Sequence, residues 1–315
     1  MSDGASVNFG VKSGLLTKLK NDKKMPWIIG IHCLNHRLEL ADATAHTSFD
    51  SLCTLLSNIH SIFEHSPKRL RALKDLAELM GEDAIKPART NGTRWVQHKL
   101  KAATILLKQY GIIILALSNI SDDAKIKGYV KQMTSFKTLA LLHLFVDFLA
   151  PVGKLSDYLQ GDSTNLLLAQ SAVEAALLAF THTSNTEYSE QLTKLVSTAK
   201  EKLDEGAAME FQSVYITDLR DGISALQHNA ESMSHRLSEE LTSRFGDIFN
   251  QSTPNSVLTA LKLLNIREWP ESKEGLYEFG NVEMTVVVQH FAEILCDKLD
   301  TAEVPGEWLQ LKICV

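Results

Sequence analysis

The sequence contains few residues that interrupt helices and no long hydrophobic run. Only seven prolines and sixteen glycines occur in 315 residues, which favours long helices over many short strands. No apolar run reaches the ~20 residues that a membrane-spanning helix needs. The N-terminus also lacks the basic and then apolar segments of a signal peptide. With a hydrophobic content of 44%, these absences predict an intracellular protein with a substantial core and no membrane partner.

Cysteine is scarce as well. The four cysteines are far apart in the sequence: Cys33, Cys53, Cys296 and Cys314. Such spacing is typical of a reducing compartment and matches no zinc finger. A structural zinc ion needs four ligands, and Cys33 and His36 supply only two. The nearest further candidates follow no standard spacing, so we expect no zinc site: they are His32, His46 and Cys53.

Positive charge is concentrated in the first third of the chain. Residues 1–109 carry 16 Lys and Arg against 10 Asp and Glu, an excess of six positive charges. Residues 110–315 carry 16 against 28, an excess of twelve negative charges. A basic front part on an acidic body favours contact with phosphates; chance segregation of surface charge is the alternative. The basic run Lys68, Arg69, Arg71 and Lys74 is either a grip on a DNA backbone or a solvated helix face.

Apolar side chains recur at helical spacing through most of the chain. A buried strand is predicted at 27–31, and a polar loop at 86–93 precedes a long helix from Arg94 to about Leu117. One stripe of apolar residues is Leu52, Leu55, Leu56, Ile59 and Phe63, and the next is Leu70, Leu73, Leu76, Ala77 and Met80, ended by Gly81. Further helices are predicted around 11–19 and over 122–134, 136–159, 164–184, 187–205, 207–229, 230–250, 255–265 and 282–300. The fold is therefore expected to be mainly α.

Three groups of residues follow one another in the order of a known pattern. The first is Asp3-Gly4-Ala5-Ser6-Val7 with Gly10 and Ser13-Gly14, the second is His32-Cys33-Leu34-Asn35-His36-Arg37-Leu38-Glu39-Leu40-Ala41, and the third is Thr93-Arg94-Trp95. A lone Cys-x-x-His would be a weak signal, but order and spacing together are specific. The chain resembles the hAT superfamily of DNA transposases and the host proteins derived from them.

The resemblance implies a particular organisation of the chain. Residues 1–47 would be a partial RNase H-like α/β core segment, and residues 48–303 a large all-helical insertion domain. Residues 304–315 would begin the return to the core. Only one of the family's three catalytic acids is matched, by Asp3, so we expect a truncated or degenerate relative.

Asp3 is the one candidate metal ligand that the resemblance supplies. In the intact family several carboxylates hold Mg²⁺ or Mn²⁺ ions, and one aspartate cannot assemble such a site. Asp3 is therefore expected to be an inactive remnant, or simply to stabilise a turn, in a chain that is no enzyme and needs no cofactor. The family pattern also places Cys33, His36 and Arg37 near the acidic site.

The third group of the pattern suggests a DNA contact. A Trp beside an Arg at a helix start can stack on an unpaired base while the guanidinium holds a phosphate, and the resemblance implies this role for Arg94 and Trp95. The alternative is that Trp95 is a core residue beneath the helix. The remaining expected DNA-binding residues are Lys68, Arg69, Arg71, Arg89 and Lys99.

Two functions therefore stay open. The first is a nuclear, catalytically incomplete hAT transposase-like protein that binds DNA. The second is a protein–protein interaction scaffold, with partners or self-association and no DNA binding. The first gains if the basic residues share one exposed face, and the second gains if they are scattered or paired with Asp75, Glu78 and Glu82.

Overall fold

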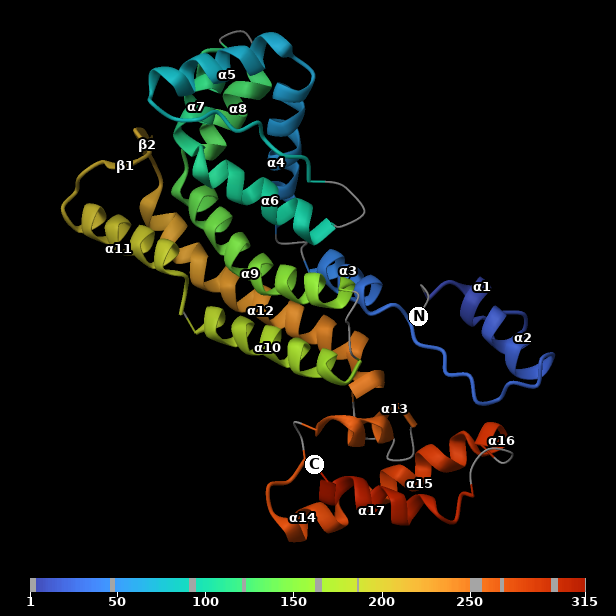
Figure 1. Cartoon of the computed structure of the whole chain (residues 1–315). Coiled ribbons are helices and arrows are strands. Elements are labelled where there is room, and N and C mark those ends of the chain that lie inside the picture. Colours follow the sequence, from blue (N-terminus) through green and yellow to red (C-terminus); the bar gives the residue numbers. More distant parts are fainter. Residues whose placement is uncertain are drawn as a thin grey trace. The chain divides into compact units, whose positions relative to one another are not determined.

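The computed structural model describes residues 4–45, 49–90, 95–120, 123–161, 166–185, 187–249, 257–266, 269–295 and 300–314. This part of the chain is mainly helical, as the sequence predicts, and its sheet has two strands (Figure 1). The chain forms two compact units. The terminal unit contains Met1–Arg37, Ser163–Ser171 and Thr242–Val315, and the central unit contains Leu38–Asp162 and Ala172–Leu241. The predicted domain boundaries at 47/48 and 303/304 stay predictions.

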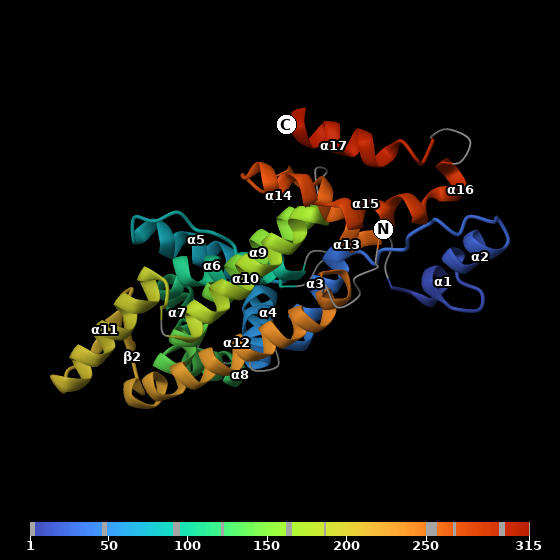
Figure 2. The ribbon, with the colours of Figure 1, turned by 90° about the horizontal axis from the view of Figure 1, so that it is seen from below.

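The central unit is a helical assembly built around one long apolar helix. Its helices are α4 (Asp50–Glu64), α5 (Pro67–Leu79), α6 (Trp95–Lys108), α7 (Tyr110–Ser118), α8 (Ala124–Met133), α9 (Phe136–Gln160) and α11 (Glu190–Asp204), together with parts of α3 (Leu34–Ala45), α10 (Leu166–Ser184) and α12 (Leu219–Phe249). Helix α9 packs lengthwise against α6 and also contacts α4, α8 and α11 (Figures 1 and 2). Burial of its Leu139, Phe145 and Phe148 makes α9 the middle of the core.

Helix α9 is apolar enough to resemble a membrane span. It has 25 residues, and 56% of its most apolar window is buried within the protein. Asp147, Lys154 and Asp157 interrupt the apolar sequence. Burial against α6 explains the hydropathy, because a core helix of a globular unit is apolar on most faces.

The stripe predicted on α4 is confirmed residue by residue. Its five members are the buried residues of that helix: Leu52, Leu55, Leu56, Ile59 and Phe63. Helix α5 begins after Ser66, whose hydroxyl accepts from the Arg69 N–H at 3.4 Å, with Pro67 in the first turn. It ends before Gly81, whose φ of +72° is a conformation that glycine adopts at little cost.

The long helix predicted from Arg94 to Leu117 is two helices. Helices α6 and α7 meet at Gln109 and their axes differ by 77°. The amide of Gln212 supports the break, because it accepts from the Gly111 N–H at 3.0 Å and donates to the Leu107 carbonyl at 2.8 Å. These bonds satisfy backbone groups that a helix end leaves without partners. Apolar periodicity gave no sign of the break, since both halves are buried.

Other predictions of secondary structure are also wrong, among them the helix over 282–300, which is interrupted between α15 and α16. Residues 207–229 are not one helix: β1 (Met209–Phe211) pairs antiparallel with β2 (Val214–Ile216), and α12 begins at Leu219. The turn residues Gln212 and Ser213 have positive φ, as two-residue hairpins require. Residues 27–31 form no strand: Trp27 lies in a turn, and residues 28–31 are irregular and mostly half-buried. A strand needs a hydrogen-bonded neighbour, and within its described residues the terminal unit contains no strand.

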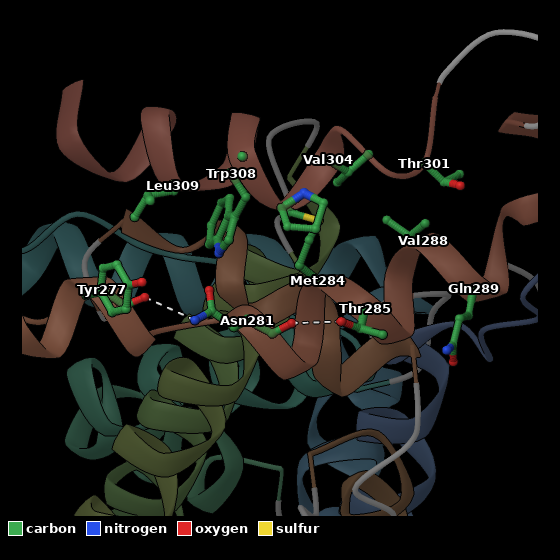
Figure 3. A pocket seen from close by; sticks show the side chains of 12 residues that line it. Tyr277, Asn281, Met284, Thr285, Val288, Gln289, Thr301, Val304, Trp308 and Leu309 are labelled. Carbon is green, nitrogen blue, oxygen red and sulfur yellow. Dashed lines mark hydrogen bonds between the residues drawn. The ribbon is translucent and has the colours of Figure 1, made fainter.

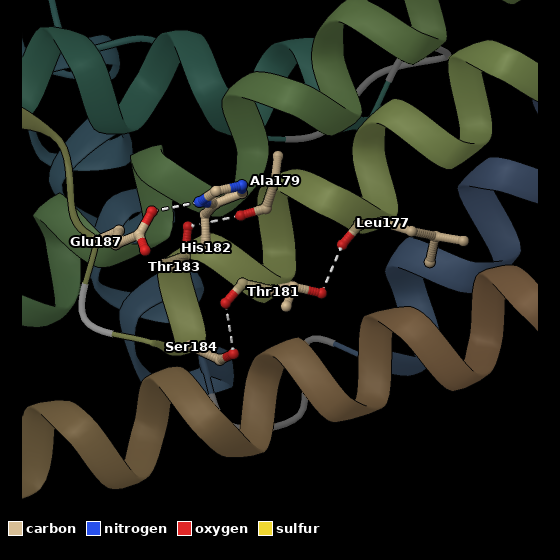
Figure 4. Close-up of polar contacts among 7 residues, drawn as sticks. All are labelled: Leu177, Ala179, Thr181, His182, Thr183, Ser184 and Glu187. Atoms are coloured by element: carbon tan, nitrogen blue, oxygen red, sulfur yellow. Dashed lines mark hydrogen bonds and ion pairs between the residues drawn. The ribbon is translucent and has the colours of Figure 1, made fainter.

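Helix α10 ends in a set of local polar contacts (Figure 4). His182 pairs through Nδ1 with Glu187 just beyond the helix end. The hydroxyl of Thr183 donates to the Ala179 carbonyl at 3.1 Å, one turn back. Both members of the His182–Glu187 pair are more than half exposed, so the pair adds little stability.

The terminal unit combines both ends of the chain. Its complete helices are α1 (Ser6–Phe9), α2 (Leu15–Asn21), α13 (Val257–Ala260), the 3₁₀ helix η2 (Leu261–Leu264), α14 (Lys273–Glu278), α15 (Asn281–His290), α16 (Ala292–Leu295) and α17 (Val304–Cys314). Trp308 is buried against Trp269 and Gly280. The buried Lys312 ammonium donates to the Tyr277 and Phe279 carbonyls at 2.9 and 3.0 Å, and so ties α17 to the end of α14.

Candidate nucleic-acid interface

A basic cleft lies between α4, the loop 82–90 and the first turns of α6, all within the central unit. Its volume is about 550 Å³. Its cationic and imidazole groups come from all three segments: His60, Lys86, Arg89, His98 and Lys101. Glu64 is its one carboxylate among the lining residues. With the histidines neutral, three cations face one anion, so the cleft attracts negative charge although the whole chain carries a net charge of −6.

The loop that carries Lys86 and Arg89 is fixed by side-chain hydrogen bonds. The buried Gln109 accepts from the Ile85 N–H at 2.8 Å and donates to the Asp83 carbonyl. His60 Nδ1 lies 2.8 Å from the Pro87 carbonyl oxygen. Pro87 is buried, whereas Lys86 and Arg89 are exposed.

The charges in the cleft are only partly neutralised. Lys86 pairs with Glu64, and this contact lowers the pKa of that carboxyl. Arg89 and Lys101 are exposed, and no carboxylate of the described residues pairs with either one. Two free cations are therefore presented to solvent on the walls of the cleft.

Trp95 begins the helix that forms one wall of this cleft. Its side chain is 47% exposed, whereas the next residue, Val96, is fully buried. Exposure of a large aromatic ring favours the predicted stacking role over the core alternative, although Trp95 itself does not line the cleft. Arg94 lies outside the described residues.

The N-terminus of α6 already has an anionic partner within the protein. The buried Glu39 of α3 faces the Trp95 and Val96 N–H groups, which favour its charged form. Burial, and then the nearby Asp42, raise the pKa of Glu39 to about 7. The positive end of the α6 dipole therefore acts on Glu39, and a DNA phosphate is not needed there.

Lys99 differs from the sequence-based expectation. Its ammonium lies 2.9 Å from the Asp42 carboxylate, whose side chain is fully buried, and Lys99 itself is only 16% exposed. Lys99 is thus a structural cation that joins α6 to α3, and it is not on the cleft. Lys99 follows the buried Val96 by three positions, so both side chains lie on the inner side of α6. The basic composition of the segment does not reveal this orientation.

The basic run on α5 is separate from the cleft. Lys68 and Arg69 line another hollow, together with Phe63 and Asn119. Arg71 is exposed on the same helix. The expected DNA-binding cations therefore lie on two separate surfaces, the basic cleft and α5, whereas Lys99 belongs to a buried ion pair. No ion pair joins the α5 cations to Asp75, Glu78 or Glu82 among the described residues.

The first two groups of the sequence pattern meet in the terminal unit. The Phe9 and His32 rings are 4.0 Å apart, and a Cβ added at Gly4 would lie 3.2 Å from the His32 ring. Gly14 is more tightly constrained, because a Cβ there would overlap the Gly10 backbone. The glycine positions of the pattern thus correspond to close packing.

The Cys-x-x-His segment lies at the start of α3. Cys33 is half-buried, His36 is exposed, and Arg37 donates through Nη1 to the Arg244 carbonyl of α12. Asp3, the expected catalytic remnant and metal ligand, lies outside the described residues. Within the described ranges, no three His, Cys, Asp or Glu side chains are grouped so as to hold a metal ion.

Comparison with known proteins gives no family assignment. No protein-family model matches the chain, and no solved structure matches it significantly.

The sequence reasoning missed several residues of the cleft. Lys101 and His98 share one face of α6 with Gln97, three and four positions apart, and helical phase alone indicates that they are neighbours. His60 and Gln109 had no such signal, because their contacts with the loop 82–90 depend on tertiary packing.

Proposed function

We propose that this chain is a hAT transposase-derived protein that binds DNA in the nucleus and is catalytically incomplete. The observation that carries the proposal is the basic cleft with the exposed Trp95 at the start of its α6 wall. Free cations hold phosphates, and an exposed indole stacks on an unpaired base. The order and spacing of the three groups of residues in the sequence support the assignment to the hAT family.

The finer assignment of the fold belongs to the same proposal. Residues 1–47 are a partial RNase H-like core segment, residues 48–303 the helical insertion, and residues 304–315 the start of the return to the core. The packing of Phe9 and Gly4 on His32 supports this assignment, because it brings the first two groups of the family pattern together.

The contribution of the cleft can be tested by the salt dependence of binding. A fluorescently labelled hairpin DNA with an unpaired overhang is titrated with the protein at several salt concentrations, and anisotropy is measured. Replacing both Arg89 and Lys101 by Ala should reduce the slope of log affinity against log salt by about two, one per phosphate contact. Lys127→Ala, which removes an exposed lysine of α8, is the matched control and should change little. The cleft is rejected as the interface if the slope of the double variant is unchanged, or if the wild-type protein does not bind the DNA.

The proposal includes the absence of strand cleavage. A lone Asp3 cannot assemble a two-metal site, so the purified chain should not nick DNA in Mg²⁺ or Mn²⁺. Metal-dependent nicking that disappears in Asp3→Ala would contradict it.

A protein-interaction scaffold is the second candidate, and a surface of the terminal unit favours it. A largely apolar pocket opens between α15 and α17, with Met284, Val288 and Trp308 in its wall (Figure 3). Leu311 and Ile313 of α17 are 49% and 76% exposed, and exposed apolar groups of this kind are common at protein interfaces. Concentration-dependent self-association by light scattering that Ile313→Lys abolishes, with no DNA binding, would establish this function instead.

A further inference from the structure

A second pocket in the central unit is built differently from the basic cleft. It has a volume of about 630 Å³ and is formed by α6, α9, α11 and β1. Most of its wall surface is apolar, and its apolar side chains are Leu107, Val146, Leu195, Met209 and Phe211. Both its size and its apolar character are typical of sites for small organic molecules.

His143 is the buried polar group of this pocket. Its side chain is 8% exposed, and Nε2 has no hydrogen-bond partner among the described residues. Burial lowers the pKa of His143 to about 4, so the ring is neutral at pH 7, with one nitrogen donating and the other accepting. An unpartnered buried nitrogen costs free energy. Nε2 is covered in the unbound protein, so a ligand hydrogen bond that recovers this cost requires the His143 ring to turn toward the pocket that it lines.

The other polar groups of the pocket limit the charge of a ligand. Asp147, one turn after His143, already accepts from the Ser189 N–H at 3.0 Å and so holds the start of α11. Lys108, Lys194 and Glu210 are exposed at the rim. Two cations and two carboxylates then balance, which favours an uncharged ligand.

The Phe211 ring sets the shape of the site. Its centroid is 6.0 Å from that of His143, and the two planes are nearly perpendicular at 82°. Aromatic groups favour such edge-to-face contacts, so a flat ring fits beside them. We propose that this pocket binds a small, uncharged aromatic molecule carrying one hydroxyl or N–H group, which hydrogen-bonds to His143.

The proposal is independent of DNA binding at the basic cleft. The cleft uses His98 and Lys101 on one stretch of α6, and the pocket uses Thr104, Leu107 and Lys108 on the next. A failure of one site therefore leaves the other standing.

Two probes of nearly equal shape test the hydrogen bond. 1-Naphthol and 1-methylnaphthalene differ in one hydroxyl, and calorimetry or fluorescence gives their affinities for the whole chain. The wild type should bind one equivalent of 1-naphthol about five- to tenfold more tightly, the range for one neutral hydrogen bond. His143→Phe should bind both probes equally. The control His182→Phe, which changes an exposed histidine of α10, should keep the preference.

A second variant, which fills the pocket, tests the proposal even if His143→Phe does not fold. Thr198 is half-exposed on the α11 wall, and Thr198→Trp should prevent binding of both probes while circular dichroism shows an intact fold. Equal affinities in the wild type, a preference that survives His143→Phe, binding that survives Thr198→Trp, or no binding at all would each overturn the proposal.

Discussion

Charged residues of the central unit divide into those that hold the fold and those that face solvent. Lys99 and Asp42 form a buried pair, and Glu39 faces the first N–H groups of α6. Arg89 and Lys101 are exposed, without a carboxylate partner among the described residues. Net charge therefore says less about DNA binding here than the environment of each cation.

Glu39 should make the protein less stable as the pH rises. Its pKa is raised from 4.5 to about 7 in the fold, so the folded state binds a proton that the unfolded state releases, and stability falls between these values. Glu39→Gln does not titrate. The difference in unfolding free energy between Glu39→Gln and the wild type should therefore grow by about 2–3 kcal/mol from acidic to mildly alkaline pH.

Urea unfolding at a series of pH values measures this difference. Leu178→Ala, which changes an exposed side chain of α10 that does not titrate, is the control and should give a pH-independent difference. A pH-independent difference for Glu39→Gln as well would show that the carboxyl has an ordinary pKa.

Trp95 should affect DNA binding and leave folding nearly unchanged. Its ring is 47% exposed, and loss of one stacked base costs about 1–3 kcal/mol of binding. In the anisotropy assay, Trp95→Ala should weaken binding to DNA with unpaired bases by that amount, and Trp95→Phe should retain much of the affinity. If Trp95→Ala instead unfolds the protein without a selective binding defect, Trp95 is a core residue and the scaffold function gains.

At the scale of elements, the bend between α6 and α7 organises the central unit. Gln212 caps it from the β1–β2 turn, and Gln109 fixes the loop 82–90. Gly111 is required where the two meet, because a Cβ there would overlap the Gln212 carbonyl oxygen. Two glutamines thus connect the hairpin, the bend and the basic cleft.

Loss of the Gln212 amide should destabilise the central unit. Gln212→Ala leaves the Gly111 N–H and the Leu107 carbonyl without their side-chain partner, a cost of about 1–3 kcal/mol. Gln227→Ala removes a glutamine that only pairs with Glu231 on the exposed face of α12, and should cost much less. Thermal unfolding of the two variants compares them directly, and equal melting temperatures would contradict the capping role.

Sequence periodicity predicted elements well where burial is one-sided. The stripe on α4 is an example, since each of its five apolar residues is buried. It failed at Gln109 and at Met209–Ile216, where hydrogen bonds to residues about a hundred positions away decide the structure. The cleft followed the same rule: Arg89 was predicted from the sequence, but His60 lines the cleft only through tertiary contacts. Lys99 was expected to face DNA but pairs with the buried Asp42, because composition does not reveal which side of a helix faces the core.

At the scale of the whole molecule, the core is unevenly distributed. Helices α1, α2, α14 and α15 have no fully buried side chain, whereas α9 is buried along most of its length. Local stability follows buried apolar contact.

Hydrogen exchange should therefore differ strongly between these helices. Amides of α4 and α9 should exchange close to the rate set by global unfolding, and those of α1, α2, α14 and α15 orders of magnitude faster, by local opening. Mass spectrometry of peptides after deuterium labelling measures both sets in one sample. Exchange of α15 as slow as that of α9 would show that the terminal helices share in the cooperative core.

The support of the bend by Gln212 also has a consequence for biosynthesis. The capping residue follows Gly111 by 101 positions, and a ribosome delivers the chain from the N-terminus at roughly 5–20 residues per second. For several seconds the apolar helices α6 and α7 have been synthesised but lack the amide that closes their junction. During that interval a nascent chain can extend them as one straight helix, so arrival of the hairpin is the step that commits it to the bent form.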